Sequence, residues 1–581
     1  MRSGPPIRRR VLRILRSCCL ASTLSSEADS ATERGGVIDV DPGKTGERTL
    51  SVPCGNRSSG PQTLRVLLPP GYRPQVRSRT GMGSALLDDR SKKMGQNHRQ
   101  SNSWECSSVH RWGGFPIVVL RRETPDVSDT QKTAEIPAAS NGVVDLHLFA
   151  DATGLLTSTG SRAFIERLKS SVANPEMLSE WASELNRAPQ MKQADACEYL
   201  VITSRKLAAA FEPWIRHQQQ AGLHAEILTT EQLESSGRGR DLPERIRNGI
   251  ADAFQRRNLQ WVLLGGDVSH VPTRMACVPQ GRTSAEGRVP ADLYFACLDG
   301  SWNRDGNDRW GESTDGEDGG EVDLVAEVEV GRAPVATPEE VAVFISKNLA
   351  AKNAPKTPSI ATVLMGGGMG SESFEPVIHE GSTLESLPGW QVRVVRDAPP
   401  PAPAWTGLEA VRELNESPAI VVYNGHGESD QAMRLEPQAL KQLRNPTPFL
   451  FSSIACDIGW FDRDGWTPPS MAEALVTVPK HGAYAAVVNA RSGWFDRRSP
   501  GRYSAEFQDG LLRRLGADKA CRLGQAVAGA REALLPRVER RGFQPYRACY
   551  LQWTLLGDPR STRSMGAVGS VPTSQGGNHA Q

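Results

Sequence analysis

Two side chains of the kinds used in nucleophilic catalysis directly follow two strand-like segments. His426 stands between two glycines, after the apolar run Ala419–Tyr423, and Cys456 follows the apolar run Pro448–Ala455. Only a short crossover separates the two runs, so we expect neighbouring parallel strands. Their carboxyl ends would meet at one edge of a sheet, with roughly 5 Å between strands. A thiol and an imidazole facing each other there form the nucleophile–base pair of a cysteine hydrolase.

The glycines beside His426 suit such a site. They leave room for a substrate backbone to approach, and they leave the N–H of Gly427 available as a donor. That N–H and the backbone N–H of Cys456 are candidates for an oxyanion hole. The structural alternative is that Cys456 is a buried thiol at a strand end and His426 a turn histidine. Spacing alone leaves both interpretations open.

The elements that must position these residues alternate between strand and helix from about residue 197 onward. Buried-type strand runs are followed by amphipathic helical runs, and the pattern returns after residue 320. The clearest examples are Tyr199–Thr203, Phe211–Ala221, Ala225–Leu228, Leu242–Arg257 and Gln260–Leu264. This βαβαβ order predicts an α/β fold with a parallel sheet and covering helices.

The residues before about 190 have a different character. Four short strand-like runs predict a smaller β-rich region over residues 49–190, with a flexible loop at about 72–110. The runs are Thr49–Cys54, Thr63–Leu68, Phe115–Leu120 and Val143–Phe149. Residues 1–48 form a basic segment and residues 563–581 a Gly/Ser/Gln-rich tail, and we predict disorder for both.

Composition excludes several classes of function. The length of 581 residues allows about four domains. The 68 Lys and Arg residues against 66 Asp and Glu leave a charge of +2, which disfavours a nucleic-acid partner. No apolar run approaches the ~20 residues of a membrane helix, and arginines interrupt the signal-like stretch at the N-terminus. The ten cysteines include no CxxC pair, which argues against a disulfide scaffold and a zinc site.

Seven short blocks, in the same order along the chain, resemble the gingipain family of cysteine peptidases, whose members share a caspase-like α/β fold. The blocks are Trp261–Asp267, Val330–Arg332, Val421–Gly427, Phe451–Phe461, Ser470–Leu475, Gly482–Trp494 and Trp553–Pro559. The resemblance covers about residues 197–562 and implies a peptidase domain over 191–562. In the family the His of the HG motif and the Cys of the AC motif are catalytic, which implies these roles for His426 and Cys456.

The resemblance implies a cysteine endopeptidase that acts on proteins or peptides. Cys456 would attack the scissile carbonyl to form a thioester, His426 would protonate the leaving amine, and water would release the acyl group. One alternative is a sortase-like transpeptidase that transfers the acyl group to an amine. A second alternative is a binding module of the same fold with an idle dyad.

Two residues are candidates for the substrate pocket. Arginine-specific relatives are expected to carry an acidic side chain after the strand that matches Ala361–Met365, and Glu372 stands in that loop. The alternative for Glu372 is a solvated loop glutamate. The glycines of residues 366–370 match no nucleotide-binding motif. Trp494, just beyond the strand Ala483–Asn489, is either a wall of the pocket for the P1 side chain or part of the core.

Residues 299–312 approach the EF-hand loop pattern, in which oxygen ligands alternate before a glycine and a distal glutamate. The candidate ligands are Asp299, Ser301, Asn303, Asp305, Asn307 and Glu312. Ser301 stands where an Asp is expected, and Asp299 would compensate. The acidic run Asp315–Asp323 either adds ligands or only solvates a loop. The resemblance also implies structural Ca²⁺, whereas ordinary turn chemistry is the alternative.

Two further expectations follow from the resemblance. Secreted peptidases of this type often carry an N-terminal pro-region, and residues 1–190 would be that segment, with cleavage sites in the Arg-rich stretch 77–100. The family and the calcium loop favour a secreted or extracytoplasmic location, although the sequence has no clear signal peptide.

Overall fold

The computed structural model describes the chain in segments, which begin at residue 48 and end at residue 562. These are residues 48–54, 62–70, 72–76, 104–122, 142–150, 162–185, 196–278, 287–315, 321–354, 360–366, 383–387, 390–397, 404–463, 469–496, 501–518, 520–538 and 545–562. The segments predicted to be disordered, 1–48 and 563–581, therefore lie almost wholly outside the described residues.

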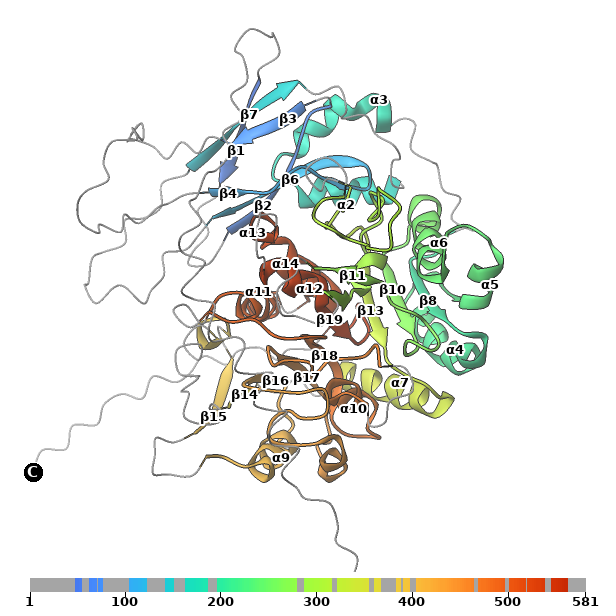
Figure 1. Ribbon diagram of the computed structural model, residues 1–581, viewed down its shortest axis with the longest axis vertical. Helices are drawn as coiled ribbons and strands as arrows, with labels where there is room; N and C mark the ends of the chain where they lie inside the picture. Colours follow the sequence, from blue (N-terminus) through green and yellow to red (C-terminus); the bar gives the residue numbers. More distant parts are fainter. Residues whose placement is uncertain are drawn as a thin grey trace, which may run out of the picture.

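A ten-stranded sheet forms the centre of the described molecule (Figure 1). In spatial order its strands are β15 (Gln391–Arg396), β14 (Ile360–Met365), β16 (Ile420–Asn424), β17 (Phe449–Ser453), β18 (Ala483–Asn489), β19 (Trp553–Leu556), β13 (Glu329–Ala333), β10 (Trp261–Gly265), β8 (Tyr199–Thr203) and β9 (Ala225–Thr229). A separate short hairpin pairs β11 (Met275–Cys277) with β12 (Arg288–Pro290).

The sheet consists of two parallel halves that run in opposite directions. Neighbouring strands are parallel throughout, except that β18 and β19 are antiparallel. The carboxyl edge of the half from β15 to β18 is therefore the amino edge of the half from β19 to β9. The predicted α/β class with a mostly parallel sheet is confirmed.

Helices cover both faces of the sheet because successive strand residues point to opposite faces. In β8, Tyr199 and Val201 face one apolar cluster, and Leu200 and Ile202 face the other. The first cluster is covered by α4 (Arg205–Gln220), α7 (Pro338–Lys352), α9 (Gly407–Asn415), the 3₁₀ helix η7 (Pro437–Gln442) and α10 (Met471–Thr477). The second is covered by α5 (Thr230–Ser235), α6 (Leu242–Arg257), the 3₁₀ helix η5 (Asp292–Phe295), α11 (Ser504–Ala517), α12 (Leu523–Glu532), α13 (Leu535–Val538) and α14 (Pro545–Gln552).

Two small antiparallel sheets precede this domain and lie at one end of the molecule in Figure 1. One pairs β1 (Arg48–Cys54), β7 (Gly142–Ala150) and β3 (Tyr72–Val76). The other contains β2 (Gln62–Leu67), β6 (Phe115–Arg122), β4 (Trp104–Cys106) and β5 (His110–Trp112). The 3₁₀ helix η3 (Pro175–Trp181) and the helices α2 (Arg162–Ser171) and α3 (Ala182–Leu185) follow.

The four strands predicted in this N-terminal part are confirmed as β1, β2, β6 and β7. The loop predicted over residues 72–110 is too long, because β3, β4 and the start of β5 lie within it. Those strands are short and partly polar, and they pair with β7 and β6, which lie further along the chain. The pairing of β3 with β7 is non-local and leaves little signal in the local sequence, whereas β5 joins β6 in a local hairpin through the turn Gly113–Gly114. The centre of that loop, residues 77–103, lies outside the described residues.

No helix in the described part of the chain is both long enough and apolar enough to cross a membrane.

Candidate active site

The pairing of β16 with β17 places the turns that carry His426 and Cys456 beside each other at one edge of the sheet. The two strands are parallel neighbours, with Tyr423 opposite Ser453. His426 lies three residues beyond Tyr423, and Cys456 lies three residues beyond Ser453. The expectation that the two runs form adjacent strands is therefore confirmed.

Hydrogen bonds tie the two strand ends together. The hydroxyl of Ser453 donates to the carbonyl of Tyr423 at 2.7 Å and accepts from the N–H of Ala455 at 3.1 Å. The phenol of Tyr423 in turn donates to the carbonyl of His426 at 2.6 Å. These bonds fix the turn that carries the histidine against the turn that carries the cysteine.

The backbone at Gly427 lies directly against the Cys456 segment. A Cβ atom at Gly427 would stand 2.6 Å from Cγ2 of Ile458 and 3.2 Å from the carbonyl oxygen of Cys456. Both distances are too short for ordinary packing, so glycine is required at this position by the close approach. Gly427 and Cys456, the two predicted oxyanion donors, are thus brought together.

Cys456 and Cys106 differ from the other described cysteines, which are buried. Burial raises the pKa of the thiols of Cys197 and Cys549 to about 12, and that of Cys521 to about 11. Cys297 is fully buried, and its pKa is raised well above the ordinary value for the same reason. Such thiols are poor nucleophiles. Cys456 is only half-buried, beyond the end of its strand.

The backbone around Cys456 makes a sharp turn. Asp457 adopts a left-handed conformation with φ +58°, and its N–H donates to the carbonyl of Arg491 at 3.0 Å. The Cys456 thiol points toward the carbonyl of Gly493, with 3.8 Å between sulfur and oxygen. Burial lowers the pKa of His426, so its imidazole is neutral near pH 7.

Charged groups surround the turn that follows Cys456. Burial raises the pKa of Asp457 to about 6; the nearby Glu428 adds to this rise and Arg491 opposes it. The guanidinium of Arg491 pairs with both carboxylate oxygens of Asp462 at 2.7 and 2.6 Å and lies 4.6 Å from the centre of a Trp460 ring. Arg491 is therefore held in place by its own carboxylate partner.

Trp494 follows Gly493, whose carbonyl faces the thiol. The backbone N–H of Trp494 donates to the hydroxyl of Ser504 at 3.0 Å, and the backbone N–H of Ser504 donates to the carbonyl of Trp494 at 3.2 Å. The Trp494 side chain is half-buried and packs against the core of the α11 face. It therefore lies beside the thiol segment and also contacts the core. Glu372 lies outside the described residues.

The six predicted calcium ligands do not form one site. Asp305 and Glu312 lie together with Asp315, their carboxylate oxygens within 4.8 Å of one another. The amide of Asn307 donates to Asp305 at 2.7 Å and to Glu312 at 3.0 Å. Gly306, at the predicted turn position, has φ +73°.

Two oxygen atoms in this loop are buried without a partner. Oδ2 of Asp315 and Oδ1 of Asn303 have no hydrogen bond, and each side chain is at least 96% buried. Ser301 instead accepts a bond from the N–H of Asn303 at 3.3 Å. The loop therefore contains buried oxygen atoms that accept no hydrogen bond and that are of the kind that binds a cation.

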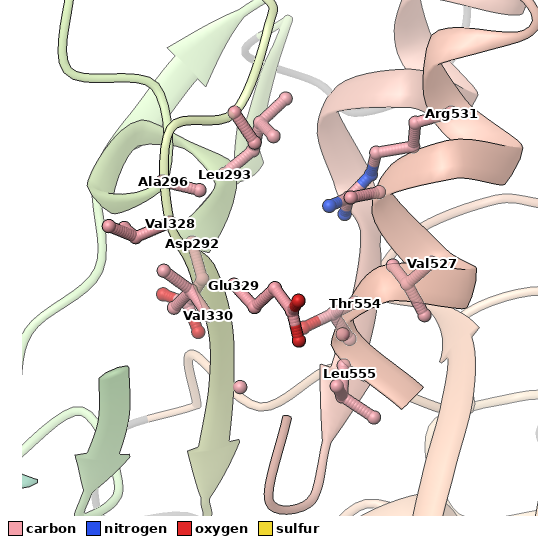
Figure 2. A pocket seen from close by; sticks show the side chains of 14 residues that line it. Asp292, Leu293, Ala296, Val328, Glu329, Val330, Val527, Arg531, Thr554 and Leu555 are labelled. Atoms are coloured by element: carbon pink, nitrogen blue, oxygen red, sulfur yellow. The ribbon is translucent and has the colours of Figure 1, made fainter. Parts of the chain in front are cut away.

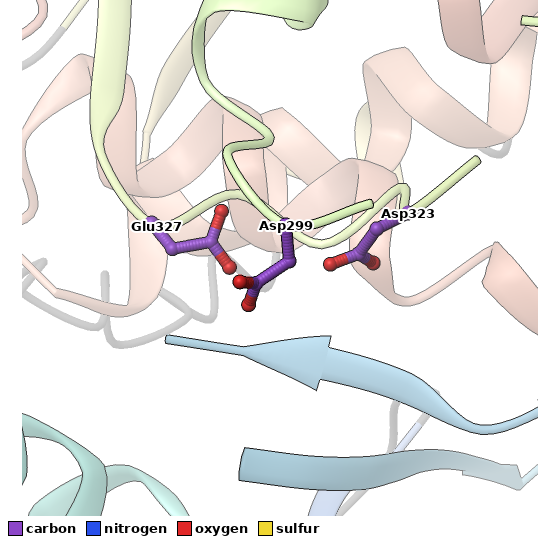
Figure 3. Close-up of side chains that lie close together, drawn as sticks. All are labelled: Asp299, Asp323 and Glu327. Carbon is purple, nitrogen blue, oxygen red and sulfur yellow. The ribbon is translucent and has the colours of Figure 1, made fainter. Parts of the chain in front are cut away.

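Asp299 belongs to a second cluster, with Asp323 and Glu327 (Figure 3). The three carboxylates point toward one another, and their nearest oxygens lie within 4.8 Å. Oδ2 of Asp323 is buried and has no hydrogen-bond partner. Burial, followed by repulsion from Asp323, raises the pKa of Asp299 to about 6. Burial and the neighbouring carboxylates raise the pKa of Glu327 well above its ordinary value.

A small cavity lies elsewhere in the described structure, between β13 and α12 (Figure 2). Figure 2 shows Glu329 and Arg531 facing it from opposite sides. The carboxylate of Glu329 accepts a hydrogen bond from the indole of Trp261 at 3.1 Å. A volume of about 20 Å³ is enough for one water molecule, so this cavity is not a substrate cleft.

Comparisons with known proteins find one family and several solved structures. The model of Peptidase family C25 matches residues 192–562. No curated protein sequence matches the chain. Similar solved structures include the following three. The Arg-specific cysteine proteinase gingipain R has 17% identity, covers 64% of this chain and 78% of its own, and gives a TM-score of 0.49. The complex of pro- and mature domains of RgpB from Porphyromonas gingivalis has 18% identity, 63% and 79% coverage and a TM-score of 0.47. A structure titled only as a protease has 16% identity, 66% and 83% coverage and a TM-score of 0.48.

An α/β sheet with a thiol and an imidazole at the ends of adjacent strands is the arrangement of a cysteine-type hydrolase. The match over residues 192–562 makes the class specific, since it covers more than half of the chain. The chain belongs to peptidase family C25, and it is a cysteine-type peptidase whose substrates are proteins or peptides. The resemblance to gingipains inferred from the sequence is confirmed.

Proposed function

We propose that this protein is a cysteine endopeptidase in which Cys456 is the nucleophile and His426 the acid and base. The equal offset of the two residues beyond the paired positions Tyr423 and Ser453 carries this proposal. The close approach of Gly427 to the Cys456 segment supports it. The proposal is also supported by the half-buried state of this thiol, because Cys197 and most other described cysteines are buried.

The reaction begins when the neutral imidazole of His426 takes the thiol proton and the sulfur of Cys456 attacks the scissile carbonyl carbon. The C–N bond breaks as His426 returns that proton to the leaving amine, and a thioester remains on Cys456. Water then attacks the thioester; His426 takes a proton from the water and returns it to sulfur as the acid product leaves. The N–H groups of Gly427 and Cys456 donate to the oxyanion in both steps.

Trp494 is proposed as one wall of the pocket for the P1 side chain. Its support is the position of the indole-bearing residue next to Gly493, whose carbonyl faces the thiol at 3.8 Å. A wall at this place would contact the substrate side chain nearest the scissile bond. The acidic pocket residue predicted from the sequence, Glu372, stays a prediction.

We also propose structural Ca²⁺. Ca²⁺ prefers six to eight oxygen ligands, and both carboxylate clusters supply oxygens of this kind. Asp305, Glu312 and Asp315 would hold one ion, and Asn303 would add its buried amide oxygen.

Asp299, Asp323 and Glu327 would hold a second ion. The fit rests on the buried oxygens without hydrogen-bond partners, because such atoms are costly unless a cation or a proton satisfies them. A bound ion supplies positive charge that neutralises the buried carboxylates. It would thereby hold the two ends of the segment 299–327 together before β13.

The first experiment is cleavage of a diverse peptide library, with products identified by mass spectrometry. Wild type, Cys456→Ala and His426→Ala are compared with and without Ca²⁺ and with an added amine. Cuts found only with the wild type support the proposal and give the P1 preference. Products joined to the amine would identify a transpeptidase instead. Cuts that persist in Cys456→Ala would refute Cys456 as nucleophile.

Calcium is tested separately by isothermal titration of the metal-stripped full chain. We expect two sites, of which Asp315→Asn removes one and Asp323→Asn the other. Titrations without any heat of binding would contradict the calcium proposal and leave the dyad proposal intact.

A further inference from the structure

The N-terminal module, defined as the described residues from 48 to 185, packs firmly on the peptidase domain. Phe164 of α2 makes edge-on contacts with Trp112 of β5 at 5.2 Å and with Phe254 of α6 at 5.1 Å between ring centres. The indole of Trp112 donates to the carbonyl of Ala326 at 3.1 Å. Apolar residues of the module and of the peptidase domain belong to one continuous core.

The turn between β5 and β6 contacts the carboxylate cluster before β13. The N–H of Gly114 donates to Asp299 at 2.8 Å, and the N–H of Gly113 donates to Glu327 at 3.2 Å. His110 lies 3.1 Å from Asp323. The module therefore sits at the amino ends of β13, β10 and β8. Because the two halves of the sheet run in opposite directions, this is also the edge that carries His426 and Cys456.

Four buried charges join the module to helices of the peptidase domain; we call them the interface quartet. They are Glu105 and Arg121 from the module and Glu506 and Arg537 from α11 and α13. Arg121 donates to Glu506 at 2.9 Å. Arg537 donates to Glu105 at 3.2 Å and to Glu506 at 2.7 and 2.8 Å. Their side chains are only 10–14% exposed.

Burial makes the interface quartet sensitive to the loss of any member. Two guanidinium groups face two carboxylates, so the net charge is zero while all four are present. Removing Arg121 would leave Glu506 with one cation in place of two. A buried carboxylate that loses a partner shifts toward water or toward its remaining donors. The docked module therefore supplies one of the donors that hold Glu506, beside Arg537 and Tyr546.

Glu506 lies in the first turn of α11, which leads to the active site. The hydroxyl of Tyr546 donates to Glu506, and the Tyr546 ring packs against Tyr503 at 4.8 Å between ring centres. Tyr503 has φ +58°, so the chain turns sharply just before Ser504. Ser504 holds Trp494 through two hydrogen bonds, at 3.0 and 3.2 Å.

The segment held by Ser504 carries the group that faces the nucleophile. The carbonyl of Gly493, next to Trp494, lies 3.8 Å from the sulfur of Cys456. A chain of contacts therefore connects Arg121 of the module to the sulfur through Glu506, the start of α11 and residues 493–494. None of these links involves the large sheet itself.

We propose that the N-terminal module is a positioning element of the peptidase: through the interface quartet it fixes residues 493–494 beside the Cys456 thiol. Arg121 is the positioning residue on the module side. This inference rests on the proposed role of Cys456. It gives the module a supporting role in the working enzyme, whereas the sequence-based expectation of a removable pro-region predicts that its loss raises activity.

The test compares Arg121→Ala with Arg65→Ala in the full-length protein. Arg65 of β2 forms another ion pair of the interface, with Glu532 at the end of α12 and not with the first turn of α11. It stacks 4.2 Å from a Trp112 ring centre. Both substitutions weaken docking, but only Arg121→Ala breaks the connection to Ser504. Arg121→Lys retains the charge and serves as the rescue variant.

We expect Arg121→Ala to lower kcat/KM about 5- to 30-fold, which is the upper part of the roughly 2- to 30-fold range of coupling through packed networks. We expect Arg65→Ala to lower Tm about as much as Arg121→Ala does. We expect it to leave kcat/KM within about two-fold of the wild type. Arg121→Lys should restore most of the activity. Equal losses in Arg121→Ala and Arg65→Ala, or no loss in either, would overturn the proposal.

A second readout does not depend on peptidase activity. The rate at which iodoacetamide alkylates Cys456 is followed by mass spectrometry of its tryptic peptide in the same variants. A change of about three-fold or more confined to Arg121→Ala supports the coupling even if no peptide is cut. Equal rates in all variants overturn it, whether or not the wild type is an active peptidase.

Discussion

The most informative single substitution is Gly427→Ala. Gly427 has no Cβ, and the structure uses that absence to bring the histidine turn against the cysteine turn. An added methyl would stand 2.6 Å from Cγ2 of Ile458, 3.0 Å from Cβ of Ala455 and 3.2 Å from the carbonyl of Cys456. Two of these neighbours belong to the backbone or to a side chain with no rotatable bond, so they yield little.

The expected size of the effect follows from the overlap. Ordinary contact begins at 3.4 Å, so the 2.6 Å approach must open by about 0.8 Å. A misplacement of about 1 Å costs roughly 100-fold in rate, which corresponds to about 2.7 kcal/mol. We therefore expect kcat/KM of Gly427→Ala to fall by about two orders of magnitude. The overpacked side chains should also cost about 1–3 kcal/mol of stability.

The matched control is Gly265→Ala, at the carboxyl end of β10 in the other half of the sheet. Its methyl would meet Phe211 at 2.8 Å and Val201 at 3.1 Å, which is a similar overlap. Its stability cost should be comparable, but it lies at the opposite edge from the dyad. The assay measures kcat/KM on a peptide chosen from the library, with urea melts of both variants.

Wild-type kcat/KM in Gly427→Ala would refute the reasoning, because the histidine turn would then have no need to approach the Cys456 segment. Equal activity losses in Gly427→Ala and Gly265→Ala would refute it in another way. They would assign the loss to general destabilisation and not to the position of the turn.

Three further predictions concern charge, metal and hydrogen bonding. Burial lowers the pKa of His426, so the unfolded state takes up a proton at this residue before the folded state does. The free energy of unfolding should therefore fall as pH drops below about 6.5, and it should fall less in His426→Gln. Urea melts at about pH 7.5 and about pH 5 measure the difference. Ca²⁺ should raise Tm more at about pH 7.5 than at about pH 5, because protons compete with the ion for carboxylates with a raised pKa. Asp323→Asn should reduce the rise in Tm at the higher pH. A rise in Tm that does not depend on pH would contradict this prediction. Ser453→Ala removes the hydrogen bonds that the hydroxyl makes to the N–H of Ala455 and to the carbonyl of Tyr423. It should lower the free energy of unfolding by about 1–3 kcal/mol and also lower kcat. A urea melt identical to that of the wild type would show that these bonds contribute nothing.

The candidate dyad was predictable because its signal is local. Each residue directly follows a short apolar run, and parallel strands bring their carboxyl ends to one edge. The pairing of Tyr423 with Ser453 then needed only that the two runs be neighbours. The small strands before residue 150 were also predictable at β1, β2, β6 and β7, where apolar residues alternate or cluster.

The carboxylate clusters were only partly predictable, because their members come together through tertiary contacts. Asp305 and Glu312 belong to one loop and were grouped correctly by spacing. Asp299, in contrast, lies with Asp323 and Glu327. Asp323 closes the acidic run that the sequence offered as a possible source of ligands, whereas Glu327 lies beyond that run and no local pattern connects it to Asp299.

The direction of the strands at the centre of the sheet was also missed. The run at Trp553–Leu556 matched a family block but gave no local sign of its orientation. Its antiparallel pairing with β18 depends on the path of α11 to α14, a long-range property of the chain.

That central strand has a consequence for the order in which the molecule is made. β19 is the last strand along the described chain, yet it lies between β18 and β13 and joins the two halves of the sheet. During synthesis Cys456 leaves the ribosome well before β19 does. Until β19 follows, β18 and β13 are unpaired edges, which favour association with other chains. The thiol segment then lacks the α11 and α14 contacts around Ser504, so a nascent chain should remain without proteolytic activity until its own central strand is complete.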